Sequence, residues 1–229
     1  MSTVVEARAA ALRAHPSLPL ITDCTQGRVE LSHATFDNWV TKTVNHLQLE
    51  CNIGEGSQVA LKLPLHWMTA VWLVSVWEAG ADVVASGAAD LTVGVAPGAD
   101  VVVVADPLGM APPPSGVSAE WFFPADVRGM PDQAVLPRPD RPGGLAGITA
   151  EDLMGLAGQY AAGVGLAEGG RLATQLAPDS TTGVLAAIAA PLAVGASVVY
   201  GEGRQEACTA TAAACRARSA LRPGTNLSL

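Results

Sequence analysis

The sequence predicts an α/β fold in three layers, with a mainly parallel sheet and helices on both of its faces. Strand and helix patterns alternate along most of the 229 residues. Continuous runs of apolar, β-branched residues over 82–85, 91–95 and 101–104 are typical of strands that are covered on both faces. The helix predicted over residues 66–79 is apolar nearly all round, which indicates burial on several sides. The length suggests one domain, possibly two, and the 49% of residues that are apolar are ample for a core. We expect residues 1–204 to form a single domain.

The first third of the chain predicts two helices and three strands. Pro16 and Pro19 end the opening helix. Ser32 is suited to cap the second helix, in which Phe36 and Val40 recur at helical spacing. The predicted elements are a helix over residues 4–14, strands over 20–22 and 28–31, a helix over 34–49 and a strand over 58–63.

The remainder of the chain starts with an irregular, proline-rich segment over residues 107–142. Pro112, Pro113 and Pro114 stand in a row there, so we expect mostly loop, with a short strand near residues 121–123. The later predicted elements are a helix over residues 150–164 with Thr149 as its cap, a strand over 171–176, a helix over 182–194 and a strand over 196–200. Residues 205–229 are expected to form an alanine-rich helix and a frayed C-terminal tail.

Charge and hydropathy argue against several kinds of partner. The net charge is −8 and the only lysines are Lys42 and Lys62, so we expect no nucleic-acid partner. The longest apolar stretch, residues 67–77, is about half of the ~20 residues that a membrane span needs. Glu6 and Arg8 interrupt the apolar residues near the N-terminus, where a signal peptide would be continuous. We therefore expect a cytoplasmic protein with no membrane contact.

Four stretches of the sequence, in collinear order, carry a resemblance to a known family. The runs GRVELSHATFDNWVTKTVNHL and NIGEGSQVALKLPLHWMTAVWLVSVWEAGADVV resemble the opening of acyl-adenylate-forming (AMP-binding, acyl-CoA synthetase-like) enzymes. The runs ITAEDLMGLAGQYAAGVGLAEGGRLATQLAP and GVLAAIAAPLAVGASVVY resemble the helices and strands that come next in that family. The resemblance covers residues 18–201 and implies the fold of the family's N-terminal domain. The chain is also similar to a short actinobacterial group of this kind.

The resemblance fails at the family's phosphate loop, T-S-G-T-T-G-x-P-K-G, in which backbone amides and a lysine hold the phosphates of ATP. The matching remnant is RPGG at residues 141–144, with Gly143 in the place of the lysine. Residues 136–141 contain no Ser, Thr or Gly, and no lysine follows Lys62. We expect no counterpart of the family's Y-G-x-T-E motif or of its small C-terminal domain either. The sequence therefore predicts no phosphate cradle.

A second candidate for nucleotide binding is Ser180-Thr181-Thr182-Gly183, which resembles the S-T-T-G core of the same loop. No Pro-Lys-Gly follows it, and it lies after the helix that should follow the loop. In the collinear reading, Thr181 stands where the family has the His of a P-x-x-H turn. We interpret these residues as the start of a helix, with Ser180 and Thr181 as caps, and keep a nucleotide site as the alternative.

These observations predict a non-catalytic binding or scaffold protein derived from the synthetase family. The alternatives are a small-ligand binding protein for a nucleotide, an acyl group or CoA, and one half of a split acyl-CoA synthetase that needs a second chain. We expect no cofactor, with ATP, AMP or CoA as the alternative, and no metal, because the cysteines and histidines lack ligand spacing. Since the helices over 66–79 and 182–194 carry one charged residue between them, we expect exposed apolar faces and a homodimer or another protein partner.

Overall fold

The computed structural model describes residues 3–85, 87 and 89–201, and the helix and tail expected over residues 205–229 lie outside them. The helices are α1 (Val4–Ala14), α2 (His33–Leu49), α3 (Trp67–Glu78), α4 (Ala150–Val164), α5 (Thr181–Val184), the π-helical turn η2 (Leu185–Ala189), α6 (Ala190–Ala193) and the short 3-10 helix η1 (Val127–Gly129). The strands are β1 (Pro19–Asp23), β2 (Val29–Ser32), β3 (Gln58–Lys62), β4 (Asp82–Val84), β5 (Leu91–Gly94), β6 (Val101–Val103), β7 (Trp121–Phe123), β8 (Arg171–Thr174) and β9 (Ser197–Tyr200). These bounds confirm the predicted elements to within a few residues.

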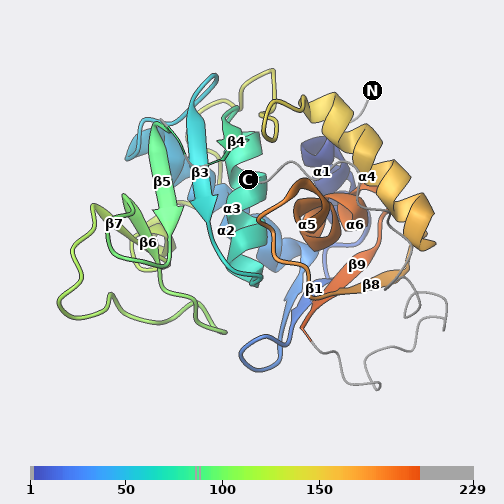
Figure 1. The fold of residues 1–229 in the computed structure, drawn as a ribbon, viewed down its shortest axis with the longest axis horizontal. Helices are drawn as coiled ribbons and strands as arrows, with labels where there is room; N and C mark the ends of the chain where they lie inside the picture. Colours follow the sequence, from blue (N-terminus) through green and yellow to red (C-terminus); the bar gives the residue numbers. More distant parts are fainter. Residues whose placement is uncertain (1–2, 86, 88, 202–229) are drawn as a thin grey trace.

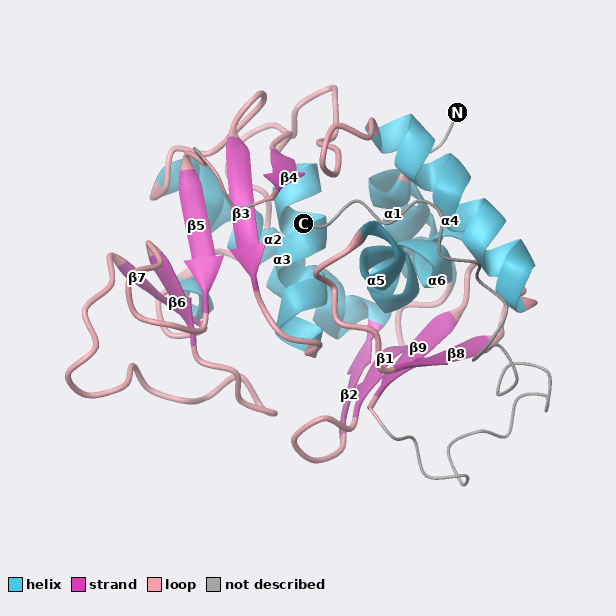
Figure 2. Ribbon diagram, in the orientation of Figure 1, coloured by secondary structure: helices cyan, strands magenta, loops and turns pink. Residues whose placement is uncertain are grey.

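The strands form two sheets, which Figures 1 and 2 show on either side of α3. The first sheet has the order β2-β1-β9-β8, in which only β2 is antiparallel to its neighbour. The second sheet has the order β4-β3-β5-β6-β7 and is parallel throughout. The predicted α/β class, with helices packed on mainly parallel strands, is confirmed. The expectation of one sheet is replaced by two, because α3 inserts between the two groups of strands.

Helix α3 explains why its sequence is apolar nearly all round. Each of its residues is buried, and it packs against α1 and α2, against β1 of the first sheet and against β3 and β4 of the second. Trp67, Trp72 and Trp77, which point in different directions around the helix, are each at most 1% exposed. A helix that contacts a neighbour on every side has no solvent face to make polar.

The helical segment from α5 to α6 is also covered by the chain itself. Its residues pack against α1 and α4 on one side and against β8 and β9 on the other, and residues 183–192 are all buried. The expectation that this segment and α3 present apolar faces to solvent is therefore wrong. The homodimer remains a prediction, but it has lost the observation from which it was inferred.

The π-helical turn in this segment has a chemical cause in Pro191. A regular helix would bond the amide of residue 191 to the carbonyl of Ala187, but proline has no N–H and its ring would clash with that carbonyl. The helix widens directly before Pro191. The hydroxyl of Tyr200, on β9, donates to the Ala187 oxygen at 2.8 Å. This buried hydroxyl gives the Ala187 carbonyl a side-chain donor and ties the helix to the first sheet.

Within the described part of the chain, no helix is both long enough and apolar enough to cross a membrane.

Candidate functional site

Parallel α/β sheets place their ligands at the carboxyl ends of the strands, which makes this edge of the first sheet the first place to look. Strands β1 and β9 end at Asp23 and Tyr200, which are partners in the register. His66, the residue before α3, meets the same edge, and its Nε2 lies 3.8 Å from Oδ2 of Asp23. Both side chains are only 2% exposed. The edge therefore contains a buried imidazole beside a buried carboxylate.

Asp23 uses its carboxylate to hold local backbone. Oδ2 accepts from the Trp67 amide at 2.8 Å, which caps the first turn of α3. Oδ1 accepts from the amide of Thr25 at 2.8 Å and from its hydroxyl at 2.6 Å. Three donors therefore compensate for the burial of this carboxylate, and its position at a helix amino end is favourable for a negative charge.

His66 is the second cap of α3. Its Nδ1 accepts from the Met68 amide at 3.3 Å, so Nε2 carries the proton of the neutral ring. Burial lowers the pKa of His66, while the charges of Asp23 and Asp106 act in the opposite direction. The neutral imidazole caps the amino end of α3 through Nδ1, while its buried Nε2 has no hydrogen-bond partner among the described residues.

The remnant of the phosphate loop, Gly143 and Gly144, is built into the second sheet. The Gly143 amide donates to the Trp77 carbonyl at 2.8 Å, and the Gly144 amide donates to Oδ1 of Asp82 at 2.6 Å. A Cβ atom on Gly143 would lie 1.7 Å from the Ala81 carbonyl oxygen, so only glycine fits there. Both amides thus serve internal packing, and a carboxylate stands where a phosphate would have to approach.

The second candidate, Ser180-Thr181-Thr182-Gly183, lies at the start of α5. Ser180 is the N-cap, and its Oγ accepts from the Gly183 amide at 3.2 Å. A Cβ atom on Gly183 would lie 1.8 Å from the Ala177 carbonyl oxygen, so this glycine is required for close packing. Thr181 is the first helical residue and not a cap, which corrects the expectation for it. The cap role of Ser180 is confirmed.

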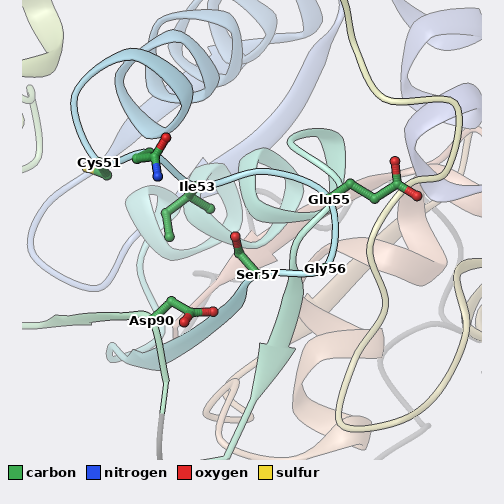
Figure 3. A pocket seen from close by; sticks show the side chains of 7 residues that line it. Cys51, Ile53, Glu55, Gly56, Ser57 and Asp90 are labelled. Atoms are coloured by element: carbon green, nitrogen blue, oxygen red, sulfur yellow. The ribbon is translucent and has the colours of Figure 1, made fainter.

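A polar hollow of about 450 Å³ opens at the opposite edge of the second sheet, near the amino ends of β3 and β5 (Figure 3). The lining residues are Cys51, Asn52, Ile53, Glu55, Gly56, Ser57 and Asp90. Burial and nearby carboxylates raise the pKa of the Cys51 thiol to about 12, so it is protonated and unreactive at neutral pH. Asp90 accepts from the Gln58 amide at 2.8 Å and thereby orders the start of β3. The hollow thus contains neither a reactive thiol nor a cation.

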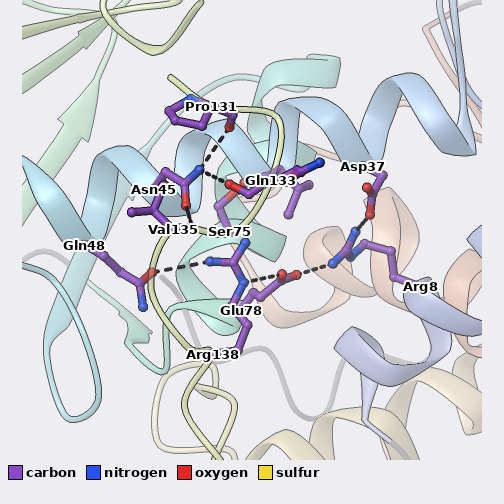
Figure 4. A network of polar contacts seen from close by, with 11 residues as sticks. Arg8, Asp37, Asn45, Gln48, Ser75, Glu78, Pro131, Gln133, Val135 and Arg138 are labelled. Carbon is purple, nitrogen blue, oxygen red and sulfur yellow. Dashed lines mark hydrogen bonds and ion pairs between the residues drawn. The ribbon is translucent and has the colours of Figure 1, made fainter. Parts of the chain in front are cut away.

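A network of polar side chains between α1, α2, α3 and the proline-rich segment was not foreseen from the sequence (Figure 4). Arg8 forms ion pairs with Asp37 and with Glu78, and Glu78 also accepts from Nε of Arg138 at 2.9 Å. Arg8 and Glu78 have side-chain exposures of only 7% and 6%. The sequence signal that was available is a row of polar residues on α2 at a spacing of three, of which Asn45 is the centre.

The described residues contain no group of His, Cys, Asp and Glu side chains that could hold a metal ion.

Comparisons with known proteins agree with the fold. No model of a protein family matches the chain. A TIGR03089 family protein of Mycobacterium tuberculosis is 47% identical over 76 residues, which are 32% of this chain and 31% of that protein. The N-terminal domain of FACL13 from Mycobacterium tuberculosis superposes with a TM-score of 0.61 and 16% identity, over 88% of this chain and 57% of that one. A fatty acyl CoA synthetase of the same organism gives 0.62 and 16%, over 87% and 44%. The chain thus spans less than two thirds of each, and identities this low establish the fold alone.

Proposed function

We propose that this chain, which has the fold of the N-terminal domains of adenylate-forming enzymes, is a non-catalytic binding or scaffold protein. The proposal rests on one observation: the backbone amides of the phosphate-loop remnant already donate hydrogen bonds to other groups of the fold. An ATP-phosphate loop works because several backbone N–H groups point at the phosphates and have no other partner. The amides of Gly143 and Gly144 instead donate to Trp77 and Asp82.

Electrostatics support the same proposal. The Asp82 carboxylate would be a like charge next to any phosphate at this place, and a close like charge opposes binding. Lys42, one of the two lysines of the chain, is engaged with the carbonyls of Arg128 and Met130 at 3.0 and 2.6 Å. Its charge is therefore committed to another part of the fold. The cytoplasmic location and the homodimer expected from the sequence are proposals of the same kind.

Thermal unfolding in the presence of ATP, AMP or CoA tests the binding side of this proposal. A ligand at a hundred times its dissociation constant would stabilise the fold by about 2.7 kcal/mol, which is easily seen as a rise in Tm. We expect none of the three to change the Tm. A rise that grows with ATP or AMP concentration and becomes larger in Asp82→Asn, which removes the repelling charge, would place a nucleotide at the remnant and contradict the proposal. A rise with CoA alone would favour the small-ligand alternative.

A further inference from the structure

We draw no further inference here: the strongest candidate, the buried cluster of Asp23 and His66 at the carboxyl edge of the first sheet, belongs to the site already described, where both side chains cap the start of α3.

Discussion

Replacing Tyr200 by Phe should destabilise the fold through one buried carbonyl. The substitution removes the hydroxyl that donates to Ala187 at 2.8 Å and otherwise preserves the ring. Ala187 is 2% exposed, and its regular helical donor is missing because residue 191 is proline. Leaving a buried acceptor without its partner costs about 1–3 kcal/mol. We expect the free energy of unfolding in urea to fall by that amount.

The chain offers a matched control and a double-mutant cycle for this prediction. Tyr160, the only other tyrosine, is partly exposed, and Tyr160→Phe should change stability by less than about 0.5 kcal/mol. Pro191→Ala restores an N–H group that is able to bond to Ala187, so Tyr200→Phe should cost at least about 1 kcal/mol less in that background. Equal costs in both backgrounds would refute the assignment of the Tyr200 hydroxyl to the gap left by Pro191.

Four further changes have defined expectations. Gly143→Ala should lower the free energy of unfolding by about 3 kcal/mol or more, because its Cβ atom would overlap the Ala81 carbonyl. Gly155→Ala, on an open face of α4, should raise it by about 0.5–1 kcal/mol. Similar effects of the two substitutions in urea melts would contradict the packing role of Gly143. Ser180→Ala should cost about 0.5–2 kcal/mol by the same measurement, and a loss near zero would mean that the cap is not used. Burial lowers the pKa of His46, so the unfolded chain binds a proton that the folded chain does not, and the free energy of unfolding should fall as the pH drops below about 6.5. His46→Phe should reduce the dependence of this free energy on pH by up to about 1.4 kcal/mol per pH unit. An unchanged pH dependence would refute the role of His46. Cys51, with a pKa of about 12, should resist iodoacetamide at pH 8 in the folded chain, as followed by mass spectrometry, and rapid alkylation would contradict its burial.

Local structure could be predicted from the sequence where single residues have strong local effects. Ser32 and Thr149 accept from backbone amides at the starts of α2 and α4, as their hydroxyls and positions predicted. Gly165, in the left-handed conformation, ends α4. Each of these signals acts over about one helical turn, which is why the element bounds agree closely with the structure.

The arrangement of the elements could not be predicted in the same way, because it depends on contacts between distant residues. An apolar helix such as α3 has the same sequence pattern whether its neighbours come from its own chain or from a partner. The expected exposed faces were wrong for this reason. The row centred on Asn45 is equally ambiguous, since a polar stripe on a helix normally faces water. Only the placement of residues 131–135, about 90 residues later in the chain, makes Asn45 a buried residue with three hydrogen bonds.

The phosphate-loop remnant has one feature that could be predicted from the sequence and one that could not. The loss of the lysine, at Gly143, and of the hydroxyls, over residues 136–141, could be read directly from the sequence. The internal use of the Gly143 and Gly144 amides could not, because it requires β4 and α3 to lie beside the remnant. The two glycines that look like the remains of a flexible loop are held by tight packing.

Carboxylate-dependent exchange between ATP and labelled pyrophosphate tests the absence of catalysis most directly. The assay reports the adenylation half-reaction alone and needs no second substrate beyond a carboxylic acid. With the full chain and a panel of short, medium and long acids, we predict exchange no faster than in a blank without protein, because the amides at the remnant have other partners and its lysine position is glycine. Exchange that rises with protein concentration, requires the acid and is abolished by unfolding the chain would contradict the account.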